Sequence, residues 1–180
     1  RHRFQKPSIW DELSLQRAGY FVVTLHRPAN VDEATKFQAL IHELITNTRG
    51  LPIIFPMHPR TEKIFNELGI ETPNLKIVKP MGYLEFNYLV ERAKAVITDS
   101  GGITEETTVM GIPCLTLRDN TERPETVIIG TNELVGTNPA NIKPALQKLF
   151  NGEWKKGGIP ELWDGKSAER IVEHLIEIYG

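Results

Sequence analysis

Residues 95–106 combine side-chain types and spacing that suit phosphate binding. A β-branched run ends at Asp99-Ser100-Gly101-Gly102, and a helical pattern follows. Backbone N–H groups and the positive end of a helix dipole converge where a strand runs into a helix, and the two glycines let a phosphate come close. Glu105, about one helical turn later, can accept hydrogen bonds from hydroxyls beside that phosphate. The segment predicts a site for a nucleotide or a nucleotide-sugar; the alternative is a plain turn capped by Ser100.

The composition indicates one soluble globular domain. The chain has 180 residues, 40% of them hydrophobic and 24% charged, and a net charge of −2, so nothing suggests nucleic-acid binding. Its single cysteine, Cys114, cannot form a disulfide within the chain and predicts a small core residue and a reducing, cytoplasmic location. No run approaches the ~20 apolar residues that span a membrane, and no secretory signal is visible. Because the chain does not begin with Met, we expect a processed chain or a piece of a longer one.

Short apolar runs alternate with helix-length patterns along the whole chain. Strands are predicted at 20–24, 51–56, 75–78, 95–99, 114–117 and 133–135, and helices at about 32–48, 60–68, 83–94, 102–110, 139–150 and 167–179. Such alternation is typical of an α/β fold with a parallel sheet covered on both faces. Residues 151–165 lack periodicity and are predicted to be an ordered crossing segment, after which the last helix packs elsewhere than its predecessors.

Ligands of such sheets bind beyond the carboxyl ends of the strands, so the polar residues that follow each strand are the candidates for binding. His26 and Arg27 follow the first predicted strand, and His58 and Arg60 follow the second. The fifth strand is followed by the run 118–125, which contains Arg118, Thr121, Glu122 and Arg123. Guanidinium groups match phosphate geometry, so this rim predicts pyrophosphate binding.

Each of these groups also has a structural interpretation. His26 and Arg27 would then be a solvated loop pair, His58 the cap of a turn, and residues 118–125 a surface loop held by salt bridges. Phe86 would be a core residue rather than a platform for a nucleobase. Five unusual strand ends in succession favour a shared ligand site over five separate coincidences.

Four segments together carry a family resemblance. They are 23–31 (Val-Thr-Leu-His-Arg-Pro-Ala-Asn-Val), 99–106 (Asp-Ser-Gly-Gly-Ile-Thr-Glu-Glu), 117–125 (Leu-Arg-Asp-Asn-Thr-Glu-Arg-Pro-Glu) and 130–136 (Gly-Thr-Asn-Glu-Leu-Val-Gly). In this order they resemble the non-hydrolysing UDP-N-acetylglucosamine 2-epimerases. Many relatives carry an acidic residue where this chain has Pro28 or Ala29, but the flanking His26, Arg27 and Asn30 match.

The resemblance implies a Rossmann-like parallel sheet in three α/β/α layers, as the second domain of a glycosyltransferase-B type fold. Residues 1–180 would be one UDP-binding domain, with 1–17 as a linker region and 166–180 as a closing helix that crosses back onto the first domain. That N-terminal domain, which supplies catalytic carboxylates in the family, is not part of this chain, so the surface that the closing helix covers would be exposed or repacked. A homodimer is implied for the full-length protein.

The resemblance also assigns roles to individual residues. His26 matches the catalytic histidine, and Arg27 is expected near the phosphates. Ser100, Gly101 and Gly102 match the pyrophosphate turn, and Glu105 matches the acid that binds the ribose. Phe86 falls where a side chain contacts uracil, and His58 where members line a second, regulatory substrate site. Arg118, Thr121, Glu122 and Arg123 are expected near the diphosphate and the sugar.

The implied reaction interconverts UDP-N-acetylglucosamine (UDP-GlcNAc) and UDP-N-acetylmannosamine (UDP-ManNAc) by elimination and re-addition of UDP. It needs no metal or redox cofactor, and no ligand-spaced Cys/His cluster is present. This chain alone would bind UDP without turnover, and its pathway would be the biosynthesis of cell envelope polysaccharides. Two alternatives remain: the donor-binding domain of a glycosyltransferase of the same fold, and a UDP-sugar-binding module without catalysis.

Overall fold

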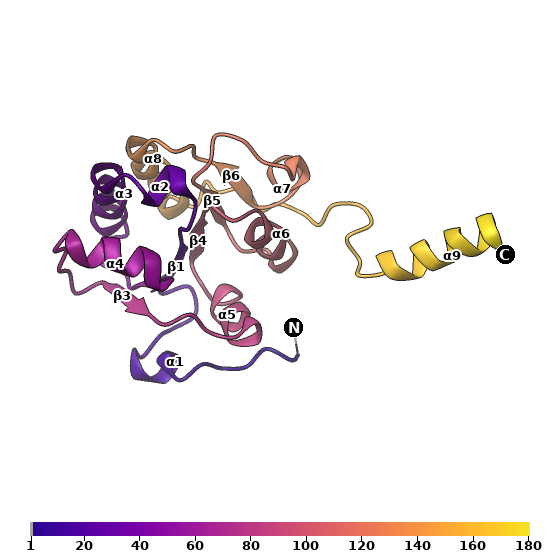
Figure 1. Cartoon of the computed structure of the whole chain (residues 1–180), viewed down its shortest axis with the longest axis horizontal. Coiled ribbons are helices and arrows are strands. Elements are labelled where there is room, and N and C mark those ends of the chain that lie inside the picture. The colour runs from indigo at the N-terminus through magenta and orange to yellow at the C-terminus, as the bar shows by residue number, and fades with distance from the viewer. Residues whose placement is uncertain (1) are drawn as a thin grey trace.

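The predicted strands form a single parallel sheet in the computed structural model, which describes residues 2–180. The strands are β1 (Phe21–Thr24), β2 (Ile53–Pro56), β3 (Leu75–Val78), β4 (Ala95–Thr98), β5 (Cys114–Thr116) and β6 (Asn132–Leu134). They lie in the order β3-β2-β1-β4-β5-β6 (Figure 1). The second strand begins at Ile53 rather than at residue 51, because Pro52 has no N–H to donate to a neighbouring strand. The predicted α/β, Rossmann-like class is confirmed.

Helices cover both faces of the sheet. One face carries α3 (Ala34–Asn47), α4 (Pro59–Glu67) and α8 (Ile142–Phe150), and the other carries α1 (Ile9–Glu12), α5 (Tyr83–Val90) and α6 (Gly101–Met110). The remaining elements are α2 (Pro28–Val31), α7 (Pro124–Ile128), the 3₁₀ turn η1 (Pro139–Asn141) and α9 (Ser167–Tyr179). The pattern predicted at 32–48 starts two residues later, because the backbone of Glu33 is extended. The pattern at 139–150 is divided, because Asn138 accepts a hydrogen bond from the N–H of Ala140 and holds a separate first turn.

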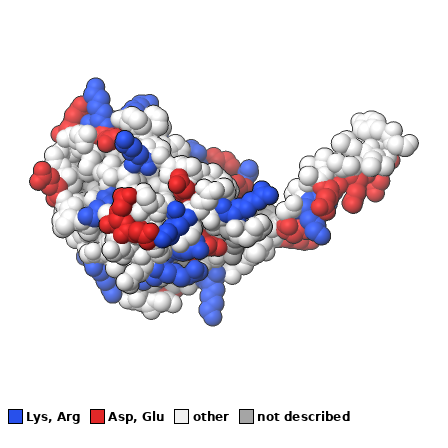
Figure 2. Space-filling model, turned by 90° about the horizontal axis from the view of Figure 1, so that it is seen from below, with Lys and Arg blue, Asp and Glu red and all other residues white. Residues whose placement is uncertain are grey.

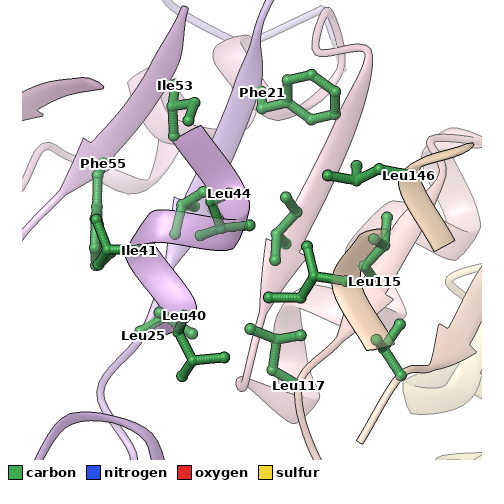
Figure 3. Packing of buried hydrophobic residues seen from close by; sticks show 14 of the residues in the cluster. Phe21, Leu25, Leu40, Ile41, Leu44, Ile53, Phe55, Leu115, Leu117 and Leu146 are labelled. Carbon is green, nitrogen blue, oxygen red and sulfur yellow. The ribbon is translucent and has the colours of Figure 1, made fainter. Parts of the chain in front are cut away.

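Alternating strand residues build the two cores. In β1, Phe21 and Val23 join the cluster under α3 and α8, whereas Val22 joins the cluster under α5. In β4, Ile97 likewise joins the first cluster and Val96 joins the second. Both sides of these strands are buried, as expected for a central parallel strand. Figure 3 shows how side chains of α3 and α8 pack onto the strands in the larger cluster.

The order of the strands fixes where a ligand can bind. From β1 the chain passes outward to β2 and then β3. It returns to form β4 on the other side of β1 and continues to β5 and β6. The loops after β1 and β4 therefore leave in opposite directions and open a crevice between them. These strands are paired in register, with Thr24 opposite Thr98 and their hydroxyls 2.7 Å apart. The motifs that begin at His26 and Ser100 lie in these two loops.

The two ends of the chain differ in how they pack. Of the predicted linker region 1–17, Arg1 lies outside the described residues, and Trp10 of α1 makes edge-to-face contacts with Tyr20 and Tyr88. In the crossing segment, the indole N–H of buried Trp154 donates to the carbonyl of Thr131, and the N–H of Gly158 donates to Ile129. The segment is thus held against α7 and β6.

Helix α9 projects from the body of the molecule (Figure 1). Its apolar residues are all exposed: Ile171, Val172, Leu175, Ile176, Ile178 and Tyr179. Acidic side chains gather along one side of the helix, which leaves the other side uncharged (Figure 2). Within residues 2–180, no helix is both long and apolar enough to cross a membrane.

Candidate functional site

The loops after β1 and β4 meet at the carboxylate of Asp99, which is fully buried. It accepts hydrogen bonds from the backbone N–H groups of His26 and Arg27, at 3.1 and 2.9 Å, and from Nδ2 of Asn30 at 3.1 Å. Nδ1 of the His26 ring lies 2.8 Å from Oδ1 of the same carboxylate. One buried acid therefore organises the loop that carries the predicted catalytic histidine.

Further bonds tie this loop to the neighbouring strands. Nε of Arg27 donates to the backbone carbonyl of Asp99 at 2.9 Å, which fixes the arginine stem beside the end of β4. Nδ2 of Asn30 also donates to the carbonyl of Leu117 at 3.0 Å, just beyond β5. Arg27 has extended backbone angles and Pro28 follows it, so α2 begins directly after the His-Arg pair. The positions of His26 and Arg27 are thus set by three adjacent strands.

The predicted phosphate turn forms the start of α6. Ser100 has extended backbone angles, its N–H donates to Oγ1 of Thr98, and its side chain caps none of the described N–H groups. The first N–H groups of a helix have no partner within the helix, so those of Gly101, Gly102 and Ile103 point out of the α6 N-terminus. They lie beside the crevice between β1 and β4, where an anion would be stabilised.

The loop after β5 lies next to this turn. A Cβ placed on Gly101 would lie 3.7 Å from Oε2 of Glu122 and 3.8 Å from Nη1 of Arg118. A Cβ on Gly102 would meet none of the described atoms within 4 Å. The turn is therefore flanked by an arginine and a carboxylate on one side and is open on the other. A phosphate bound at the turn would contact the Arg118 guanidinium.

The loop itself is held by side-chain bonds. Arg118 donates to both carboxylate oxygens of Glu122, at 2.6 and 2.8 Å, and to Oδ1 of Asn120 at 3.1 Å. Asp119 accepts hydrogen bonds from the N–H and the hydroxyl of Thr137, beyond β6. The loop is therefore shaped before any ligand binds.

Electrostatics keep the Arg118–Glu122 pair ionised. Hydrogen bonds from Arg118 lower the pKa of Glu122 to about 2, and Glu122 in turn raises the pKa of Arg118. Arg118 is almost fully buried, whereas the Glu122 side chain is mostly exposed. The carboxylate thus holds the guanidinium in place at the turn.

The predicted ribose-binding acid also has a partner in this structure. Nε of Arg123 donates to Oε1 of Glu105 at 2.6 Å. The backbone N–H of Arg123 donates to the hydroxyl of Thr121. The hydrogen bond with Glu105 raises the pKa of Arg123. The structure thus brings Glu105 of α6 and the loop 121–123 to one place.

A cavity of about 510 Å³ adjoins Glu105. Its walls are mainly apolar and include Phe4, Leu84, Val109, Met110 and Trp163. Two polar groups, Glu106 and Tyr83, lie in its wall; their interaction raises the pKa of Tyr83, and burial raises the pKa of Glu106. A mostly apolar hollow therefore lies along the side of α6 that carries Glu105 and Val109.

Phe86 and His58 take no part in the hydrogen bonds around Asp99. Phe86 is half-buried and packs against the smaller core cluster, on the face of the sheet that carries α5 and α6. Nδ1 of His58 accepts the N–H of Arg60 at the start of α4, and Arg60 pairs with Asp32 at 3.0 Å. Arg60 is thus engaged away from the turn.

Sequence reasoning missed the structural centre of this site. Asp99 and Asn30 lie inside the quoted motifs, but neither was assigned a role, because their pairing joins residues 69 positions apart. The available signal was an acid directly at the end of a buried strand. Among residues 2–180, no group of three or more His, Cys, Asp or Glu side chains is close enough to hold a metal ion.

Comparisons with known proteins identify the family of this chain. The model of the UDP-N-acetylglucosamine 2-epimerase family matches residues 1–176. A UDP-N-acetylglucosamine 2-epimerase of Methanocaldococcus jannaschii is 41% identical over 165 residues, which cover 87% of this chain and 44% of that protein. A UDP-2,3-diacetamido-2,3-dideoxy-D-glucuronate 2-epimerase of Pseudomonas aeruginosa is 33% identical over 165 residues, which cover 89% of this chain and 45% of that protein.

A solved structure of a UDP-GlcNAc 2-epimerase is also similar to this chain. The M. jannaschii UDP-GlcNAc 2-epimerase in complex with UDP-GlcNAc and UDP superposes with a TM-score of 0.79 at 38% identity, over 97% of this chain and 49% of the other. This chain spans about half the length of the relatives it matches. From the match over residues 1–176 and these likenesses, the chain belongs to the UDP-N-acetylglucosamine 2-epimerase family.

Proposed function

We propose that this chain is the nucleotide-binding half of a UDP-N-acetylglucosamine 2-epimerase that interconverts UDP-GlcNAc and UDP-ManNAc. One observation carries the proposal: the open N-terminus of α6 lies beside Arg118, and Glu105 follows about one turn further along the same helix, paired with Arg123. The N–H groups at the α6 N-terminus and the Arg118 guanidinium can hold a diphosphate, and Glu105 can bind ribose hydroxyls. The UDP complex of the M. jannaschii relative supports the same ligand.

The chemistry requires a site that stabilises a departing diphosphate. The C2 proton of the sugar is not acidic enough for its removal alone, so it leaves together with UDP to give a 2-acetamidoglucal. A proton is then delivered to the opposite face of C2 as UDP adds back to C1, which inverts C2. The N–H groups of Gly101 and Gly102, the α6 dipole and Arg27 stabilise the anion as it forms; losing one such donor typically costs ~3 kcal/mol. His26 assists by hydrogen bonding or proton transfer at a phosphate oxygen.

The carboxylates of this rim are engaged in other ways. Asp99 is bound by the loop after β1, Glu122 by Arg118, and Glu105 by Arg123. We therefore place the remaining acid and base groups in a domain outside this chain, which the matched share of about 44% in the relatives supports. The exposed apolar side of α9 would pack on that domain.

Finer assignments belong to the same proposal. Phe86 would contact uracil, His58 would line a second, regulatory substrate site, and Thr121 would contribute near the sugar. The complete enzyme would be a cytoplasmic homodimer that supplies cell envelope polysaccharide biosynthesis.

The identity of the sugar has one specific competitor. The P. aeruginosa relative acts on UDP-2,3-diacetamido-2,3-dideoxy-D-glucuronate, at 33% identity. UDP-GlcNAc is favoured because the M. jannaschii UDP-GlcNAc epimerase is 41% identical over the same length.

Calorimetry on this chain tests the proposal. We expect UDP to bind and ADP to bind at least about ten-fold more weakly, a difference of about 1.4 kcal/mol. Incubation of the chain alone with UDP-GlcNAc should yield no UDP-ManNAc. Tighter binding of ADP than of UDP would contradict the assignment. Assaying the longer protein with UDP-GlcNAc and no acceptor separates epimerase from transferase, because only an epimerase forms UDP-ManNAc under these conditions.

A further inference from the structure

The contact between His26 and Asp99 has a consequence for the protonation of the histidine ring. We propose that Asp99 is the positioning residue for His26: it holds the ring proton on Nδ1 and leaves Nε2 as the nitrogen that faces the crevice. The catalytic use of this arrangement rests on the proposed epimerase function, whereas the arrangement itself does not.

The hydrogen bonds around Asp99 carry the argument. Its side chain accepts from three N–H groups, those of His26, Arg27 and the Asn30 amide. A carboxylate that accepts from three donors presents only acceptor oxygens to a further group. Nδ1 of His26, 2.8 Å from Oδ1, must then be the donor of their contact. A neutral imidazole carries one N–H, so Nε2 keeps a free lone pair.

The surroundings orient the ring as well as the proton. The backbone N–H and the ring of His26 bind the same carboxylate, so the side chain is held at two points. The His26 side chain is 58% exposed while Asp99 is fully buried, so the edge with Nε2 faces outward. From there Nε2 can accept a proton, and the imidazolium that results is stabilised by the carboxylate behind it.

His58 provides an internal reference with the opposite arrangement. Its Nδ1 accepts the backbone N–H of Arg60 at 3.3 Å, so the neutral ring carries its proton on Nε2. One long-range ¹H–¹⁵N spectrum of the 180-residue chain, at about pH 8.5 where ordinary imidazoles are neutral, should therefore show opposite tautomers for His26 and His58. Substitution of each histidine by Asn assigns the two signals. A His26 ring protonated on Nε2 in the wild-type chain would overturn the proposal.

Two variants separate positioning from a general structural role. In Asp99→Asn, an amide that keeps accepting the loop N–H groups presents its NH₂ to His26, so the ring should switch to the Nε2–H tautomer. In the matched control Asn30→Ala, one donor to Asp99 is lost but the His26 contact remains, so the tautomer should not change. Retention of the Nδ1–H form in Asp99→Asn would refute the proposal. If Asp99→Asn does not fold, the wild-type tautomer decides.

UDP calorimetry on the same samples keeps the two proposals distinguishable. Asp99 also holds the backbone and side chain of Arg27, so the test of the proposed function uses UDP binding by the wild-type chain. Absence of UDP binding by the wild-type chain would contradict the proposed function and leave the tautomer result standing.

Discussion

The Nε atom of Arg123 lies 2.6 Å from Oε1 of Glu105, and this contact joins the loop after β5 to the first turns of α6 across 18 positions of sequence. Both side chains are about half exposed. The pair is therefore accessible to a ligand, and it turns the Glu105 carboxylate towards the loop that flanks the phosphate turn. A ribose bound there would share Glu105 with Arg123.

Glu105→Gln should weaken UDP binding about 10- to 100-fold, because hydrogen bonds to a charged group contribute about 1.5–3 kcal/mol. Calorimetry with 2′,3′-dideoxy-UDP identifies the ligand group involved, since this analogue should bind wild type and variant equally. Glu67→Gln, at an exposed position on α4, serves as the control and should leave UDP binding unchanged. An equal loss for UDP and the dideoxy analogue would show that Glu105 does not contact the ribose.

Gly101→Val should abolish measurable UDP binding while the fold persists. A Cβ at this position has ordinary contacts with Glu122 and Arg118, so the helix tolerates it, but the added methyl groups occupy the space where phosphate approaches. Circular dichroism should show the wild-type spectrum, and calorimetry should show no heat of UDP binding. Gly158→Val, at an exposed glycine outside the site, is the control for substitution by valine. Wild-type UDP affinity in Gly101→Val would refute the phosphate turn.

Glu122→Gln should lower stability at neutral pH, and the difference from wild type should vanish in acid. The pKa of Glu122 is lowered to about 2 in the fold, from an ordinary value of 4.5. A lowered carboxylate pKa contributes stability above pH 4.5 that is lost as the pH falls towards 2. Thermal unfolding of both proteins at pH 7, 4 and 2 measures the effect. A difference in Tm that stays constant with pH would exclude the ionised pair as its source.

Glu106→Gln should have the opposite effect at neutral pH. Burial raises the pKa of Glu106, so the fold prefers the protonated acid, and the stability linked to it is present below pH 4.5 and lost as the pH rises. The neutral glutamine avoids that loss. We expect a higher Tm than wild type at pH 7 and no gain at pH 4, measured by calorimetric scanning. A lower Tm for the variant at pH 7 would contradict the inferred cost of ionising Glu106.

Local patterns were sufficient to predict most elements. Period-two and period-3.6 hydrophobicity depends on residues close in sequence, so the six strands and the helices α3, α4, α5, α6, α8 and α9 were located to within a few residues, whereas the short helices α1, α2 and α7 were not predicted. Glycine and serine after a strand similarly marked the start of α6. The errors lie where one backbone residue interrupts a pattern, as Glu33 does before α3.

Pairings between distant segments were not predictable from one sequence. Asp99 meets His26 and Asn30 only because β1 and β4 are neighbours in the sheet, and Arg123 meets Glu105 only because the loop after β5 returns to α6. These contacts depend on strand order and on the path of a loop. Sequences with the same local pattern can differ in both. The sequence alone thus determined the elements and the polar residues that stand at the strand ends. The tertiary structure decided that Asp99 holds His26 and that Arg123 pairs with Glu105, because long-range packing sets those distances.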